Sequence, residues 1–369
     1  MVITKKEMLK TAFSVADTLI SEHSGAISTG WEYDAALALC GIAALYDISK
    51  DEKYFTYIKN SMEALIDPDG NVPAYNKEAY NLDFISPGNI CFWLYDKTHN
   101  ERYMKVIKQL KSQLKSQPRT ESGVYFHKLI YPDQVWLDGI FMAQPFRAKY
   151  ISRFEARHDF SDIVKQIQTA VSITYNPSHG LCVHACDESR RIFWADKKTG
   201  QSQNVWGRAC GWLCMAITDL LDIIDINSPD GKNLFDILSK TVSDILRVRD
   251  KKSGVWYQVL DSFEEGNYKE ATCSCMFAYT INKAISRGYF DKSVYAPILS
   301  DITDAFFREF IRTTPHGTYI TNCCGGAGLG PDNHRERDGS LKYYFSEKTR
   351  DNDFKGVGPF LMLAADYCL

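Results

Sequence analysis

Six short glycine phrases, each set between two helical stretches, constrain the fold of this 369-residue chain more than any other feature. Each phrase has a small or polar residue, a glycine and then an alternating segment. A glycine adopts the left-handed C′ conformation that ends a helix without steric cost, so we expect each one to close a helix and open an extended link. The glycines are Gly25, Gly70, Gly123, Gly180, Gly254 and Gly317.

Apolar residues recur with helical spacing in twelve stretches, so the phrases mark six helix pairs. Closing six hairpins into a ring buries the apolar faces of every pair, which predicts an all-α (α/α)6 barrel. No low-complexity linker divides residues 1–369, so we expect a single domain. An irregular helical protein with ordinary glycine turns is the alternative. The predicted helices are 5–22, 33–48, 53–66, 83–98, 100–116, 138–157, 160–175, 206–226, 230–248, 270–287, 291–312 and 353–368.

The long glycine links lead into every second helix, so those helices should line the ring and begin at one mouth. Asp83 and Asp138 open two of these predicted inner helices. The simpler interpretation is that both are N-caps, because Asp is a preferred capping residue. The alternative is that one is a general acid, kept protonated by an apolar wall such as Trp136 and by a nearby negative charge. The stretch 313–352 is expected to be a loop folded across this mouth.

Two histidines, His127 and His184, occupy equivalent places in two links, which favours hydrogen bonding to a ligand over a purely structural role. The phrase WGRACGW opens another inner helix, and its Arg208 and Trp212 are four residues apart on one face. Arg can pair with a carboxylate and Trp can stack on a sugar ring. The alternative is a buried Trp with the Arg extending past it to solvent. Tyr33, before another inner helix, adds an aromatic side chain to the rim.

Charge and cysteine usage exclude several classes of protein. The net charge of −3 gives no electrostatic case for nucleic acid, and no apolar run is long enough to span a membrane. The 11 cysteines are odd in number, lie mostly in apolar stretches and show no C-x2-C pair. We therefore expect free thiols, no metal and a cytoplasmic location. The first residues show no signal-peptide core, but a leader removed from the natural protein stays an open alternative.

Four segments carry a resemblance to a known family: YPDQVWLDGIFMAQPF, WGRACGW, VHACDES and RDGSLKYYFSEK with the later KGVGPF. From about Trp31 to the C-terminus the chain resembles the unsaturated rhamnogalacturonyl hydrolases of glycoside hydrolase family 105. Their relatives are the unsaturated glucuronyl hydrolases of family 88. The resemblance implies the (α/α)6 barrel and a small unsaturated oligosaccharide substrate, cut by a polysaccharide lyase to leave a 4,5-unsaturated uronic acid. It also implies that no metal or organic cofactor is needed.

The same resemblance implies roles for individual residues. Asp138 would be the acid/base that protonates C4 of the vinyl ether while water adds at C5, and Asp83 would be the second carboxylate. A sugar isomerase or epimerase that uses His127 and His184, and a non-catalytic glycan-binding protein, stay open alternatives. The positions that would bind substrate are Tyr33, His127, Lys128, Trp136, His184, Trp206, Arg208 and Trp212.

Overall fold

Six inner helices form a closed ring in the computed structural model, which describes residues 2–368. Each inner helix contacts the next, and the last returns to the first. The predicted (α/α)6 barrel is therefore confirmed. The inner helices are α2 (Tyr33–Ser49), α4 (Gly88–Thr98), α6 (Leu137–Phe154), α8 (Gly207–Leu221), α10 (Ala271–Ser286) and α13 (Phe354–Tyr367). The outer helices are α1 (Lys5–Glu22), α3 (Glu52–Glu63), α5 (Glu101–Ser116), α7 (Ser161–Thr174), α9 (Pro229–Arg247) and α11 (Lys292–Phe310).

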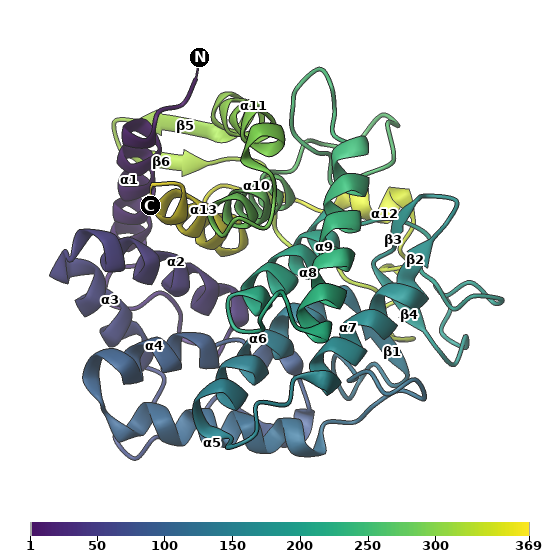
Figure 1. Cartoon of the computed structure of the whole chain (residues 1–369), viewed down its shortest axis with the longest axis horizontal. Coiled ribbons are helices and arrows are strands. Elements are labelled where there is room, and N and C mark those ends of the chain that lie inside the picture. The colour runs from purple at the N-terminus through teal and green to yellow at the C-terminus, as the bar shows by residue number, and fades with distance from the viewer. Residues whose placement is uncertain (1, 369) are drawn as a thin grey trace.

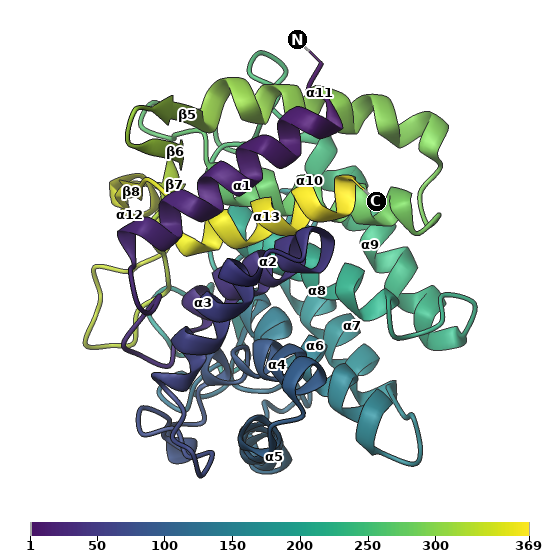
Figure 2. The same cartoon turned by 90° about the vertical axis from the view of Figure 1, so that its left-hand side faces the viewer.

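The two ends of the chain close the ring. Figures 1 and 2 show α1 beside α13, so the sixth hairpin joins the first helix to the last. Between α13 and α2 the backbones come close at Gly41 and Gly358. A Cβ on Gly41 would lie 2.7 Å from the Gly358 carbonyl oxygen. The closing contact therefore depends on the absence of side chains at these two positions.

The burial of the helices separates the two layers. Almost every side chain of α8 and α10 is buried, because each helix is covered by its neighbours in the ring and by its outer partner. The outer helices α5 and α9 bury one stripe and leave the opposite face in water. This difference is the expected pattern for fully enclosed and surface helices.

The prediction that the six phrase glycines occupy the C′ position of a helix is wrong. All six have positive φ, between 65° and 155°, but each lies beyond the C′ position, in the link between an outer helix and the next inner helix. Gly180 closes the turn between β2 (Tyr175–Asn176) and β3 (Leu181–Cys182), and Gly317 begins β6 (Gly317–Ile320) opposite β5 (Ile311–Thr314). The outer helix must turn back to reach the start of the inner helix, and this reversal needs the left-handed conformation.

The links also form short structures that periodicity did not reveal. Strand β1 (Gln134–Trp136) pairs with β4 (Ala185–Asp187), and β7 (Cys323–Cys324) pairs with β8 (Thr349–Arg350). The stretch 313–352 contains α12 (Leu341–Ser346). In Figure 2, α13 runs to the C-terminus at the right, and α12, β7 and β8 gather at its left-hand end, where α13 begins. The inner helix α13 therefore starts at a mouth covered by this stretch.

The predicted helix 83–98 is interrupted. Two 3-10 turns, η1 (Lys77–Ala79) and η2 (Leu82–Phe84), precede α4, which begins only at Gly88. Pro87 explains the break, since proline has no N–H and disfavours the helical conformation of the residue before it. Asp83 consequently lies in η2, one turn before the inner helix that it was expected to open.

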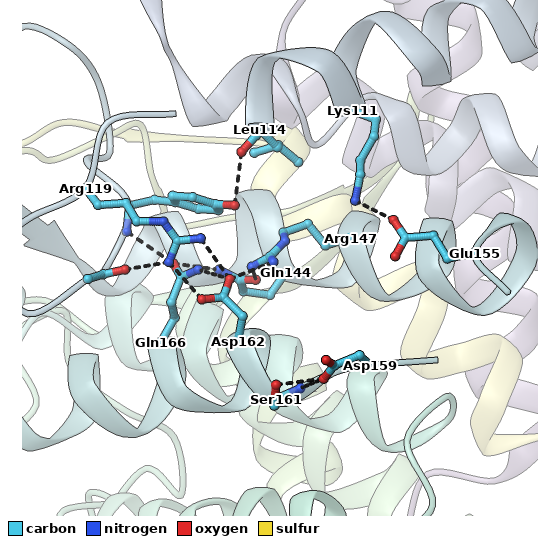
Figure 3. Close-up of polar contacts among 12 residues, drawn as sticks. Lys111, Leu114, Arg119, Gln144, Arg147, Glu155, Asp159, Ser161, Asp162 and Gln166 are labelled. Carbon is cyan, nitrogen blue, oxygen red and sulfur yellow. Dashed lines mark hydrogen bonds and ion pairs between the residues drawn. The ribbon is translucent and has the colours of Figure 1, made fainter. Parts of the chain in front are cut away.

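A polar network fixes α6 to its outer partner and to the preceding link (Figure 3). Asp162 of α7 accepts hydrogen bonds from Arg119, Arg147 and Gln166, at 2.7 to 3.0 Å. Burial alone would raise the pKa of Asp162, but the two guanidinium groups hold it well below its ordinary value. Because Arg147 belongs to α6 and Arg119 to the link before it, Asp162 holds α6 and that link together.

Two further observations concern the thiol groups and the length of the helices. All 11 cysteines are free thiols, and all except Cys40 and Cys368 are buried. None of the described helices is long and apolar enough to cross a membrane.

Candidate active site

The β1–β4 sheet fixes the start of α6 against the link that carries His184. Trp136 pairs with Ala185 across the sheet, and the Leu137 N–H donates a hydrogen bond of 3.3 Å to the His184 carbonyl. Asp138 follows in the first turn of α6. A sheet of three residue pairs therefore places the Asp138 carboxylate beside the His184 imidazole.

Asp138 does not cap α6, so the capping interpretation is wrong for this residue. Trp136 occupies the N-cap, and no side chain caps the helix. The Oδ2 atom of Asp138 lies 3.4 Å from Nε2 of His184, which is fully buried, and the Asp138 side chain is 13% exposed. Neither atom has a hydrogen-bond partner among residues 2–368. A buried carboxylate oxygen without a donor is costly and marks a place where a reacting group is expected.

Asp83 is the centre of a second charged group. The capping interpretation is wrong here too, because Asn81 caps η2. Oδ2 of Asp83 lies 2.7 Å from Nζ of Lys128, and Oδ1 lies 3.3 Å from Nε2 of His127. Burial alone would raise the pKa of Asp83, but His127 and Lys128 hold it well below its ordinary value. Burial would lower the pKa of Lys128, and Asp83 instead raises it. Asp83 and Lys128 therefore form an ionised pair.

The depressed pKa of Asp83 predicts how this pair contributes to stability. A carboxylate whose pKa is lower in the folded state stabilises the protein fully above its unfolded pKa, about 4, and loses this contribution as the pH falls toward the folded value. We expect Asp83→Asn to lower Tm by the same amount at pH 7 and pH 5, and by less below about pH 4. Thermal melts followed by circular dichroism test this. The control is Asp69→Asn, because Asp69 is exposed. If the Tm difference between Asp83→Asn and the wild type already changes between pH 7 and pH 5, Asp83 does not form the ionised pair.

The Trp136 indole lies between His127, beside Asp83, and His184, beside Asp138. The His127 ring stacks on it with centroids 5.3 Å apart and planes at 8°, and His184 meets it edge-on at 5.1 Å. Tyr131 also stacks on the indole at 4.9 Å. Trp136 is itself buried, and a Cβ on Gly328 would lie 3.6 Å from it. Trp136 was expected to wall Asp138. In the structure its indole packs against both histidines, and the loop after β7 covers it.

Gly139 allows α6 to approach His127. A Cβ at this position would lie 3.1 Å from Nδ1 of His127 and 3.2 Å from Cδ1 of Leu82. The Leu82 N–H donates to the His127 carbonyl at 2.9 Å, so η2 and the His127 link move together. A side chain after Asp138 would therefore displace His127 or Leu82.

Gly139→Ala should separate activity from stability. Alanine favours a helix by about 1 kcal/mol over glycine, which offsets the cost of a tight contact. His127, however, must shift by a few tenths of an ångström. We expect kcat/KM to fall by roughly tenfold, since a misplacement of 1 Å can cost a hundredfold, while Tm stays within a few degrees. The control is Gly326→Ala, which adds a Cβ with nothing within 4 Å and should change neither kcat/KM nor Tm. Unchanged kinetics for Gly139→Ala would show that His127 tolerates displacement.

Arg208 lies in the first turn of α8 and is committed to protein partners. Its side chain is 1% exposed, and its Nη2 donates to the Cys324 carbonyl and, at 3.3 Å, to Thr272 Oγ1. Oε1 of Glu270, also 1% exposed, lies 3.6 Å away. Nε of Arg208 has no partner among the described residues. The expected alternative of an Arg extending to solvent is wrong.

Glu270 is a residue that sequence reasoning missed. It is the N-cap of α10, and its carboxylate accepts hydrogen bonds from the N–H groups of Thr272, Cys273 and Cys324 at 2.7 to 3.0 Å. Glu270 therefore joins α8, α10 and β7. The sequence placed Glu270 as the first residue of the predicted helix 270–287, and Glu is not among the preferred capping residues; in the structure α10 begins one residue later.

Three aromatic residues from the prediction complete the inner wall. Trp212 stacks on Phe141 at 4.6 Å and meets Tyr33 at 6.1 Å. Trp206 lies 4.6 Å from the His184 ring, and its indole is 5.2 Å from the Arg208 guanidinium. The indole N–H groups of Trp206 and Trp212 are buried without an acceptor in the described chain. Such unpartnered donors suit an anionic or hydroxyl-rich ligand.

Tyr344 is a second residue that was not singled out. Its hydroxyl lies 2.7 Å from Nδ1 of His184, on the side of the ring opposite Asp138. It belongs to α12, inside a segment that was expected to be loop. The segment RDGSLKYYF carried part of the family resemblance, but nothing in the sequence connected it with a histidine 160 residues earlier.

A cavity of about 610 Å³ opens beside Asp83 and Tyr33 at this mouth. Burial raises the pKa of Tyr33 well above its ordinary value, and the negative charge of Asp83 adds to the effect. Among residues 2–368 no group of three or more His, Cys, Asp or Glu side chains is arranged to hold a metal ion. The cavity is lined by His23, Trp31, Glu32, Tyr33, Asp34, Asn81, Asp83, Phe84, Arg350, Asp351, Asn352, Asp353 and Phe354.

Comparison with known proteins gives consistent matches. The model of Glycosyl Hydrolase Family 88 matches residues 9–369. A solved glycoside hydrolase of family 105 from C. acetobutylicum ATCC 824 is 37% identical, with a TM-score of 0.93 over 97% of this chain and 99% of that one. Protein Atu3128 of Agrobacterium fabrum is 32% identical over 62% of this chain and 99% of its own length. The unsaturated rhamnogalacturonyl hydrolase YesR of Bacillus subtilis is 24% identical over 72% of this chain and 74% of its own length.

Proposed function

Because the chain belongs to glycosyl hydrolase family 88, we propose that it is an unsaturated uronyl hydrolase. It releases the 4,5-unsaturated uronic acid from the non-reducing end of oligosaccharides that polysaccharide lyases generate. One observation supports this proposal most strongly: the Asp138 carboxylate, free of any capping role, faces the buried His184 with an unpartnered oxygen.

The division of roles follows from the two carboxylates. Asp83 is held ionised by Lys128 and His127, so it is not the proton donor. Asp138 gives its proton to C4 of the vinyl ether, and water adds at C5 and returns a proton to the Asp138 carboxylate. Two carboxylates in different surroundings can hold such different roles. General acid–base catalysis of this kind typically contributes about 10² to 10⁴ in rate.

The remaining steps need no nucleophile from the protein. The C5 hemiketal breaks its bond to the ring oxygen and becomes a ketone. C1 is then a hemiacetal, which loses the second sugar as an alcohol and becomes an aldehyde. The glycosidic bond is not attacked directly, so the reaction differs from that of glycosidases that form a covalent intermediate.

The cavity beside Asp83 favours a neutral second sugar. Its lining contains five carboxylates and one guanidinium, Arg350. The buried Lys355 pairs with Asp34 at 3.2 Å and with Asp353 at 2.9 Å, but Glu32 has no cationic partner among the described residues. Such a surface can accept hydrogen bonds from sugar hydroxyls and repels sulfate or carboxylate groups.

An absorbance assay on lyase products tests the proposal, because the enoate chromophore disappears on hydration. We expect the enoate absorbance to fall faster for an unsaturated uronyl disaccharide with a neutral deoxyhexose than for one with a sulfated hexosamine. Glu32→Gln should reduce this difference in rate. No loss on any lyase product would refute the hydrolase function. Bound substrate with unchanged absorbance would indicate a glycan-binding protein, and C2 proton exchange without cleavage would indicate an isomerase. Faster hydrolysis of the sulfated product would refute only the neutral second sugar.

A further inference from the structure

The His184 imidazole lies between a phenol and a carboxylate. Its Nδ1 is 2.7 Å from the Tyr344 hydroxyl, and its Nε2 is 3.4 Å from Oδ2 of Asp138. Both His184 and Tyr344 are fully buried, so water does not compete for these atoms. The two ring nitrogens therefore face different chemical groups, and the position of the ring proton decides what Asp138 meets.

The position of that proton follows from hydrogen-bond satisfaction. Burial raises the pKa of Tyr344 well above its ordinary value, so the phenol keeps its proton. Within residues 2–368 the hydroxyl has no partner other than His184. If Nδ1 of the neutral ring carried the proton, the buried phenolic O–H would have no acceptor, which is costly. The phenol therefore donates to Nδ1, and the ring proton lies on Nε2.

Packing alone does not select this arrangement. Trp206 at 4.6 Å and Trp136 at 5.1 Å hold the plane of the His184 ring. These contacts change little if the ring turns by 180° or if its proton moves. Tyr344 is the group in the described chain that distinguishes Nδ1 from the other ring atoms.

We infer that Tyr344 is a positioning residue, whose hydroxyl holds His184 in the tautomer that presents Nε2–H to Asp138. The kinetic consequence rests on the proposed function. When Asp138 transfers its proton to C4 it becomes a carboxylate in a buried site, and Nε2–H is the donor placed to stabilise it. Without the phenol, this donor is not held in place.

Tyr344→Phe removes only the hydroxyl and is the direct test. We expect kcat on the preferred lyase disaccharide to fall by about fivefold to a hundredfold, the range for one unsatisfied buried group, with KM within about twofold of the wild type. The matched control is Tyr343→Phe on the same helix. The Tyr343 hydroxyl accepts the Gly328 N–H at 2.9 Å and does not touch His184. Tyr343→Phe should keep kcat within about twofold of the wild type, since it removes only the hydrogen bond from the Gly328 loop.

Nitrogen-15 NMR of histidine-labelled protein provides a readout that does not depend on activity. The His184 signals are identified by their loss in His184→Gln. We expect a protonated Nε2 and an unprotonated Nδ1 in the wild type, and loss of this pattern in Tyr344→Phe. A protonated Nδ1 in the neutral wild-type ring, or a Tyr344→Phe variant with unchanged tautomer and kcat, would overturn the inference. If the wild type hydrolyses no lyase product, the proposed function fails, while the NMR result still decides whether Tyr344 sets the tautomer.

Discussion

Asp138→Asn should fold, melt within a few degrees of the wild type and lose at least about a hundredfold in kcat. Stability changes little because Asp138 does not cap α6 and makes no hydrogen bond that Asn would lose. Asn has the same shape, but it can neither donate a carboxylic proton to C4 nor accept one from water. The loss corresponds to about 3 kcal/mol or more of activation free energy. Initial rates of enoate loss at saturating disaccharide measure it, and binding of the disaccharide should persist.

Asp133→Asn is the matched control for this variant. Asp133 lies in the same link, where its partner Arg191 is 81% exposed, and an exposed ion pair contributes little. Its φ of 59° is one that Asn adopts readily, so both stability and kcat should stay near wild type. If Asp138→Asn keeps more than about a tenth of kcat, less than ~1.4 kcal/mol of the barrier depends on its proton. Asp138 would then not be the acid of this reaction.

The fold could be predicted because its signal is repeated. A pair of stretches with helical periodicity and a glycine phrase recur six times along the chain. The role of the glycines was predicted wrongly because a glycine after a helix has the same local sequence whether it caps the helix or turns the chain a few residues later. Only the path to the next helix, as at Gly180 between β2 and β3, distinguishes the two.

The site was harder to predict, because its geometry depends on contacts between distant segments. Strands β1 and β4 have three residues each, too few for any periodicity, yet they place His184 beside Asp138. The interpretation of Asp138 as a cap could be rejected only once Trp136 was seen at the N-cap. Glu270 contacts Arg208 and Cys324, and Tyr344 contacts His184. These partners are distant in the sequence, so local sequence patterns do not reveal the contacts.

Asp83 was expected to begin an inner helix, and this local prediction was wrong. Its position before an apolar stretch favoured a helix start, but Pro87 delays α4 and leaves Asp83 in η2. There its charge is balanced by Lys128 at 2.7 Å. From the sequence, a negative charge at Asp83 was expected to help keep a neighbouring carboxylic acid protonated. The Lys128 ammonium beside Asp83 weakens this effect.

Arg208 is expected to have a large effect on stability as well as on activity. A role in binding alone would lower kcat/KM of Arg208→Ala and leave the fold intact. The buried contact with Glu270 changes this expectation, because removing one partner of a buried ion pair typically costs about 3–5 kcal/mol. We expect Arg208→Ala to unfold at markedly lower urea concentration than the wild type, and Glu270→Gln to be destabilised as well, since it leaves Arg208 charged and unpaired.

The double variant Arg208→Met/Glu270→Gln separates the structural role of Arg208 from a role in binding. A neutral pair of similar volume removes both buried charges, so part of the stability lost in the single variants Arg208→Met and Glu270→Gln should return. A double-mutant cycle over these three variants measures the coupling. The Arg208 guanidinium also lies 5.2 Å from the Trp206 indole, whose N–H has no partner in the described chain, and we propose that the carboxylate of the unsaturated sugar binds there. We therefore expect kcat/KM of the double variant to stay at least about tenfold below wild type, although the protein is folded. Recovery of near wild-type kcat/KM together with stability would show that Arg208 serves only to hold Glu270, α10 and β7 in place.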